Sequence, residues 1–145
     1  MFILRLKNFI TVVFALMLSL FLVFALTMGG ANRFSALDGE RVFYLYSASS
    51  QAVIKGKITP LELFWVRGEC VTMPCQNKEE KLQEILKLYN ASVLFEESVG
   101  GTHSYYCRTQ NWGQTTSING VGVNLHIAFD GELCVVGAPL IFGGF

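Results

Sequence analysis

The sequence predicts an α+β protein: an N-terminal transmembrane helix, then a small domain with a mainly antiparallel sheet and one main helix packed on one face. Three observations lead to this class. A charge-free apolar run lies near the N-terminus, an amphipathic helical pattern covers about residues 77–90, and the remaining chain alternates short β-prone runs with turn residues. Such hairpin-rich patterns favour an antiparallel sheet with the helix on one of its faces.

The apolar run over residues 9–28 contains three polar side chains and no charged one. A helix of this length rises about 30 Å, which is enough to cross the hydrocarbon core of a membrane. Arg5 and Lys7 precede the run and predict a cytoplasmic N-terminus with the domain outside. Residues 1–31 are therefore expected to be a membrane anchor or uncleaved signal. The alternative is a protein secreted after cleavage near Ala31, where small residues follow the run.

Composition limits the class of function. Of 145 residues, 52% are hydrophobic and 15% charged, and 11 basic residues balance 11 acidic ones. Ordinary domains carry about 25% charge, and disordered chains are more charged and less apolar. Nucleic-acid binding proteins usually show a basic excess, so no nucleic-acid partner is expected. The apolar excess continues after the anchor, which predicts a covered surface: a protein partner, a homodimer contact or the membrane itself.

The chain after the anchor is expected to divide into a linker over residues 32–40 and an extracytoplasmic domain over residues 41–145. Three runs predict strands before the helix, because they hold aromatic and β-branched residues and are followed by turn residues. These runs are residues 42–46, 51–57 and 61–66, the last ending at Arg67-Gly68-Glu69.

The helix carries its own start and stop signals. Its apolar positions fall on one face, at Leu82, Ile85, Leu86 and Tyr89. Asn77 is expected to cap the first turn, with Glu80 three residues later as in a capping box. Asn90 is well placed to leave the helix in a left-handed conformation.

A β-meander is predicted after the helix. Asn119-Gly120 is a strong hairpin signal because both central residues need a positive φ. Alternation from Val123 to Phe129 predicts a strand with one buried face, which leaves His126 on the polar face as a surface histidine. The predicted strands are residues 92–97, 103–108, 123–129, 133–136 and 140–142, with turns at Gly100-Gly101 and Asp130-Gly131.

The four cysteines all follow the apolar run, so they are expected in an oxidising compartment, where disulfides form. The favoured pairs are Cys70 with Cys75, which enclose a short loop, and Cys107 with Cys134, which lie in predicted strands of the meander. The alternative is four reduced thiols, some of them buried as small hydrophobic residues.

Candidates for chemistry are few. A thiol nucleophile needs a neighbouring base, and Cys107 with His126 is the pair that the predicted strands suggest. Cys134 and His103 are further members of such a pair, although His103 is expected in a turn. His103 and the cysteines also supply zinc ligand types, but their spacing is not that of a zinc finger or ribbon, so no metal or cofactor is predicted. The adjacent Glu96 and Glu97 are expected on opposite faces of a strand.

The last third of the chain holds three distinctive segments: SYYC (104–107), NLHIAF (124–129) and VVGAPLIFGGF (135–145). In these it resembles the YwmB-like family of small exported bacterial proteins of unknown activity. The resemblance implies a fold like that of the TATA-box-binding protein, a curved antiparallel sheet with helices on one face. It is a likeness of fold, implies no DNA binding and carries no functional residues.

These observations favour a membrane-anchored bacterial envelope protein whose domain binds a partner or acts as a scaffold, and do not favour an enzyme. Two alternatives stay open. One is an envelope hydrolase that uses Cys107 or Cys134 with a histidine, and the other is a metal-stabilised module.

Overall fold

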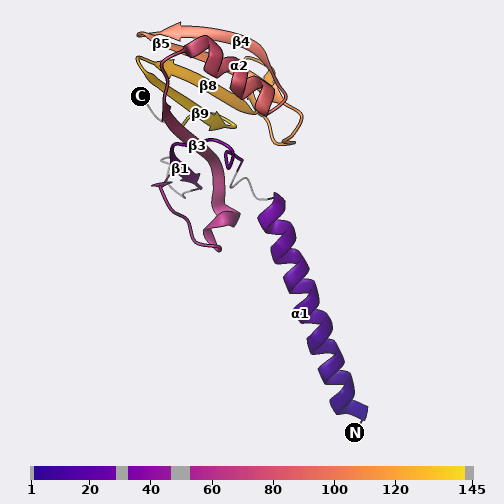
Figure 1. The fold of residues 1–145 in the computed structure, drawn as a ribbon. Helices are drawn as coiled ribbons and strands as arrows, with labels where there is room; N and C mark the ends of the chain where they lie inside the picture. The colour runs from indigo at the N-terminus through magenta and orange to yellow at the C-terminus, as the bar shows by residue number, and fades with distance from the viewer. Residues whose placement is uncertain (1, 29–32, 47–52, 143–145) are drawn as a thin grey trace.

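The computed structural model describes residues 2–28, 33–46 and 53–142 and confirms an α+β fold (Figure 1). A long helix, α1 (Phe2–Met28), extends away from a folded domain. The domain contains a seven-stranded sheet and the helix α2 (Lys78–Leu88). The N-terminal helix and the mainly antiparallel sheet with its one packed helix are thus both present.

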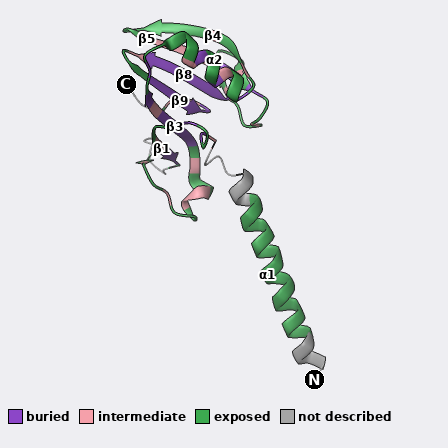
Figure 2. Cartoon of the chain, in the orientation of Figure 1, coloured by how far each residue is buried: buried purple, intermediate pink, exposed green. Residues whose placement is uncertain are grey.

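The residues Leu6–Phe24 of α1 are apolar and long enough to cross a membrane. Nineteen helical residues rise about 28 Å, close to the thickness of a hydrocarbon core. None of this stretch is buried against the domain, and Figure 2 shows it exposed along its length. A helix of this kind at an N-terminus fits a single-pass anchor or a signal sequence.

The sheet is antiparallel throughout and has the order β2-β1-β3-β9-β8-β5-β4. Its strands are β1 (Glu40–Leu45), β2 (Val53–Lys55), β3 (Val66–Pro74), β4 (Ala91–Val99), β5 (Thr102–Thr109), β8 (Leu125–Asp130) and β9 (Leu133–Ala138). A small hairpin, β6 (Thr116–Ile118) and β7 (Val121–Val123), precedes β8, and a 3-10 helix, η1 (Glu62–Trp65), precedes β3.

The main core lies between α2 and one face of the sheet. Leu82 and Ile85 of α2 pack against inward-facing side chains of the central strands, which Figure 2 shows buried. The strand residues of this core include Val71, Met73, Cys107, Leu125, Ile127, Phe129, Cys134 and Val136. Burial of this apolar surface is the main force that holds the domain together.

The predicted linker over residues 32–40 is part of the folded domain where the structure describes it. Phe34 is fully buried and Leu37 is 3% exposed. The Phe34 ring packs edge-on against Tyr89 and Trp112, with 5.7 Å between ring centroids in each case. The apolar side chains of this segment thus complete the core beside α2.

Two predicted strands are wrong. Residues 61–66 form η1 and only the start of β3, because Thr59 donates its backbone N–H to the Glu62 carboxylate at 2.9 Å and the chain turns there. The residues expected to end that strand, 67–69, lie inside β3. Residues 140–142 form no strand and instead cross over the sheet, as described below.

The local turn and capping signals are confirmed. The Asn77 side chain accepts a hydrogen bond from the Glu80 N–H at 3.3 Å, and α2 begins at the next residue. Asn90 leaves the helix at a φ of 48°. Asn119 and Gly120 have φ values of 50° and 79°, as the hairpin requires. His103 lies in β5 and not in the turn.

Candidate functional site

The sheet face opposite α2 carries an aligned row of side chains from five strands. Tyr106 pairs with His126, His126 with Gly137, Gly137 with Cys70, and Cys70 with Val42. Residues paired in this way share one face of a sheet. We call this the open face, because among the described elements no helix packs on it.

The C-terminal strap, residues 140–142, crosses the open face at two glycines. A Cβ on Gly137 would lie 2.7 Å from Cγ1 of Ile141, and a Cβ on Gly68 would lie 3.0 Å from the Phe142 ring. Glycine in a strand often marks such a close approach. The Phe142 ring also meets Tyr44 edge-on, with centroids 5.3 Å apart. Ile141 and Phe142 of the strap thus occupy the space that a side chain at Gly137 or at Gly68 would fill.

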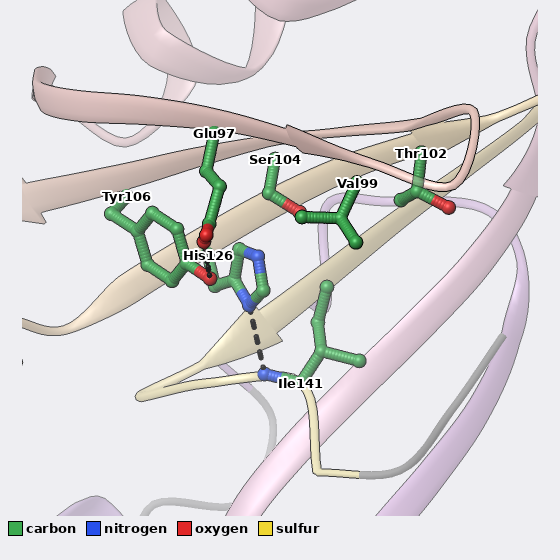
Figure 3. A pocket seen from close by; sticks show the side chains of 7 residues that line it. All are labelled: Glu97, Val99, Thr102, Ser104, Tyr106, His126 and Ile141. Carbon is green, nitrogen blue, oxygen red and sulfur yellow. Dashed lines mark hydrogen bonds between the residues drawn. The ribbon is translucent and has the colours of Figure 1, made fainter.

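His126 is held beneath this strap and is 6% exposed, so the expectation of a surface histidine is corrected. Its Nδ1 accepts a hydrogen bond from the Ile141 N–H at 3.3 Å (Figure 3). A backbone N–H can only donate, so Nδ1 carries the lone pair and the neutral ring has its proton on Nε2. Burial lowers the pKa of His126 to about 4, which keeps the ring neutral.

The ring of His126 also belongs to an aromatic stack. It lies 4.4 Å from the Tyr106 ring, nearly parallel to it, and Tyr106 in turn stacks on Phe95 at 4.5 Å. The Tyr106 hydroxyl donates to the Glu97 carboxylate at 3.5 Å, and burial raises the pKa of Tyr106, so this hydroxyl keeps its proton. The stack fixes the orientation of His126 from one side and the strap fixes it from the other.

A cleft of about 280 Å³ opens beside His126. Figure 3 shows the side chains that line it: Glu97, Val99, Thr102, Ser104, Tyr106, His126 and Ile141. Within the described part of the chain, the buried Nε2 of His126 has no hydrogen-bond partner. The cleft therefore places the Thr102 and Ser104 hydroxyls and an apolar rim beside the His126 ring, whose buried Nε2 N–H lacks an acceptor among the described residues. This combination suits a ligand that offers an acceptor oxygen.

This arrangement does not suit a serine hydrolase. Ser104 shares the cleft with His126, but a general base must present its lone pair to the hydroxyl. Here Nε2 bears the proton and Nδ1 is occupied by the strap. His126 is therefore not placed to act as a general base toward Ser104.

The predicted pair of Cys107 and His126 is not brought together. Cys107 pairs with Leu125 in the core under α2, whereas its neighbour Tyr106 pairs with His126 on the open face. Burial raises the pKa of the Cys107 and Cys134 thiols to about 12, so neither is a ready thiolate. Both thiols belong to the core.

The predicted disulfides are not formed: all four cysteines are free and buried. Cys70 and Cys75 are five positions apart in a segment that is almost all extended strand, which places their Cα atoms about 16 Å apart, whereas a disulfide needs Cα atoms within about 7 Å. Cys107 lies opposite Leu125 and Cys134 opposite Phe129, on two strands that β8 separates. Strand order, which spacing alone does not reveal, keeps both pairs apart.

The zinc ligand set is also not assembled. Among the described residues, no group of three or more His, Cys, Asp or Glu side chains could hold a metal ion. His103 instead stacks on Tyr105 and lies 3.2 Å from the Glu96 carboxylate. Glu96 and Glu97 make their contacts with different partners, His103 and Tyr106, as expected for opposite faces.

A second polar cluster lies in the core, around the fully buried Glu69. One carboxylate oxygen accepts the Arg33 N–H at 2.8 Å, and the other has no partner among the described residues. Burial raises the pKa of Glu69. Arg41 donates to the Phe34 and Leu37 carbonyls at 3.0 and 3.3 Å. These contacts hold the segment after α1 onto the sheet, so the cluster is structural.

Sequence reasoning missed most of the cleft residues. Ser104 and Tyr106 were assigned to a strand, and their spacing of two already placed them on one face. Glu97 and Ile141 line the cleft only because of the strand order and the path of the strap, and neither of these is indicated by a local sequence pattern. No family model, curated protein or solved structure matches the chain.

Proposed function

We propose that this chain is a single-pass bacterial membrane protein whose domain lies outside the cytoplasm and binds a protein partner through the His126 cleft. The observation that carries the proposal is that His126 lines a cleft on the open face while its buried Nε2 proton has no acceptor among the described residues. An unpaired buried donor costs about 1–3 kcal/mol, and a bound acceptor removes that cost.

The lining of the cleft indicates the chemistry of the partner. Val99 and Ile141 offer apolar contact, while Ser104 and Thr102 offer hydroxyls beside the His126 donor. A polypeptide segment meets these requirements, because it presents carbonyl oxygens next to apolar side chains. A small ligand with a carboxylate is the other outcome that the test below distinguishes.

The membrane part of the proposal is supported by α1, with its apolar span Leu6–Phe24 and the basic Arg5 and Lys7 at its start. A reporter enzyme fused after Phe145 tests the topology. We expect activity from a reporter that works only outside the cytoplasm. Activity from a reporter that works only inside would contradict the orientation.

The binding part is tested by photocrosslinking in the full chain, in membranes of the source cells. A photoreactive residue at Val99, 67% exposed at the cleft, should give a discrete crosslinked band of higher mass. Leu88, 45% exposed on α2, is the matched control and should not give it. Filling the cleft with Ser104→Trp should abolish the band.

Equal labelling from both positions, or a band that survives Ser104→Trp, would contradict a specific protein partner in the cleft. If no protein is crosslinked from Val99, and a cysteine at this position reacts with a thiol reagent more slowly in membranes than in the purified chain, a small ligand occupies the cleft instead.

A further inference from the structure

Three large apolar side chains lie exposed within five residues around η1. Leu61, Phe64 and Trp65 are 76%, 49% and 59% exposed. Leu61 and Phe64 are three residues apart, and in a 3-10 helix such residues lie on the same side. Single exposed apolar residues are ordinary, but a cluster that includes tryptophan indicates a covered surface. We call these three residues the η1 patch.

The η1 patch contacts the apolar helix α1. The Phe64 ring stacks on the Phe21 ring, with centroids 6.2 Å apart and an interplanar angle of 12°. In Figure 1, the short coil that precedes β3 lies beside the end of α1 nearest the domain. Phe21 lies in the second half of the apolar run over residues 9–28, seven residues before its end, or about 10.5 Å along the helix axis. Once α1 spans a bilayer, Phe64 therefore lies beside the membrane-embedded part of α1, on the side of the bilayer where the domain lies.

The Glu62 carboxylate and the Trp65 carbonyl, which adjoin the patch, are both paired, which reduces the cost of bringing the patch to an apolar phase. The Glu62 carboxylate forms an ion pair with Lys55 and accepts the backbone N–H of Thr59. The Trp65 carbonyl accepts the Tyr46 N–H at 2.8 Å. The patch thus presents apolar and aromatic side chains while its neighbouring charge and carbonyl are satisfied.

We propose that Leu61, Phe64 and Trp65 insert into the bilayer interface beside α1 and give the domain a second membrane contact. The inference rests on the proposed function, in which α1 is a retained anchor. Tryptophan and other aromatic residues are enriched at this level of a membrane, where an apolar ring and a polar edge are both accommodated. Two contacts, the helix and the patch, fix the height and rotation of the domain, which a single helix alone leaves free.

The test uses the full chain in phosphatidylcholine vesicles that contain lipid brominated near the headgroup, which quenches tryptophan at the interface. The chain has two tryptophans, and the second, Trp112, packs on the domain core beside Phe34. We expect bromolipid to quench the wild-type emission and to leave the emission of Trp65→Phe unchanged. The difference in quenching between the two proteins gives the contribution of Trp65.

Matched variants separate insertion from general proximity. The double variant Leu61→Ser with Phe64→Ser should reduce the quenching of Trp65 at least severalfold and shift its emission to longer wavelength. Leu133→Ser, at a site 48% exposed at the start of β9, should leave both unchanged. Unquenched Trp65 emission at the wavelength of solvent-exposed tryptophan would overturn the inference.

An alkaline wash of the same vesicles distinguishes the two proposals. Loss of the chain from the lipid contradicts the anchor and the η1 contact together. Retention of the chain with unquenched Trp65 contradicts only the η1 contact. A third outcome is Trp65 emission that bromolipid does not quench and that lies at short wavelength only at high protein concentration. It would show that the patch contacts a second copy of the chain, and it would also overturn the inference.

Discussion

Replacing Gly137 with alanine should lift the C-terminal strap from the sheet. The added Cβ would lie 2.7 Å from Cγ1 of Ile141 and 2.8 Å from both the Ile141 nitrogen and the Leu140 carbonyl carbon. Two of these three atoms belong to the main chain, so a side-chain rotation cannot relieve the clash. Overpacking of this kind costs about 1–3 kcal/mol. Loss of the Ile141 N–H bond to His126 adds about 0.5–1.5 kcal/mol.

A small opposing effect reduces this sum. Alanine restricts the unfolded chain and so stabilises a compatible site by about 0.4–1 kcal/mol. The expected net loss is therefore about 0.5–4 kcal/mol, which for a domain of this size lowers the melting temperature by roughly 2–16 °C. Thermal unfolding of the full chain in detergent measures this shift. Nitrogen NMR of His126 gives a second readout, because release of the strap frees Nδ1 and should raise the pKa of the ring.

Gly113→Ala is the matched control, since a Cβ there meets no heavy atom within 4 Å. The reasoning is refuted if the Gly137 and Gly113 variants melt within about 2 °C of each other, a difference of under about 0.5 kcal/mol. It is also refuted if the Gly137 variant melts lower but His126 keeps its tautomer and pKa, because the strap would then have stayed in place.

Three further predictions follow from buried groups. Glu69→Ala should lower the free energy of unfolding by about 1–3 kcal/mol more than Glu69→Gln in denaturant titrations, because glutamine keeps an acceptor for the Arg33 N–H. The pKa of His126 falls on folding from 6.5 to about 4, so its contribution to stability is full above pH 6.5 and is lost as the pH falls through about 4. Acid titration of unfolding should therefore be flatter in His126→Gln, and an unchanged slope would count against this. A thiol reagent should leave the four buried cysteines unlabelled in the native chain and label four after unfolding without reductant, whereas two disulfides would leave none.

Sequence alone was sufficient where the signal is local. The cap of α2 depends on Asn77 and Glu80, which are three residues apart, and the turn at Asn119-Gly120 depends on the positive φ of two adjacent residues. The antiparallel class of the sheet follows from such short turns. The boundaries of α2 and of the strands predicted over residues 92–97, 103–108 and 133–136 are accordingly close to those of the structure, whereas the run over residues 123–129 is divided between β7 and β8.

Sequence reasoning failed where the partner is distant along the chain. Gly68 and Glu69 have the composition of a turn, yet both lie within β3. Glu69 bonds the N–H of Arg33, 36 residues earlier, and Gly68 makes room for the ring of Phe142 near the C-terminus. Neither relation has a periodicity that a sequence window detects.

The candidate site shows the same limit. The alternation of β8 placed His126 on the less apolar face, which is correct, and that face was expected to meet solvent. The strap and the Tyr106 ring cover it instead, so a surface histidine becomes a buried donor. Disulfide pairing failed for a related reason, because the order of β5, β8 and β9 decides which cysteines meet.

The apolar excess of the domain now has a spatial explanation with two parts. Tyr46, Val53, Ile54 and the η1 patch account for six of the exposed large apolar side chains, and all lie between β1 and the start of β3, the part of the sheet nearest α1. A bilayer contact there explains why this edge tolerates them.

The cleft lies two or more strands away, on β4, β5 and β8, and is lined by groups that need a polar partner as well as an apolar one. A membrane cannot supply that acceptor at a fixed position, so the two surfaces require different occupants. The substitutions at η1 should therefore change the membrane contact without changing the crosslink at Val99, and Ser104→Trp should do the reverse.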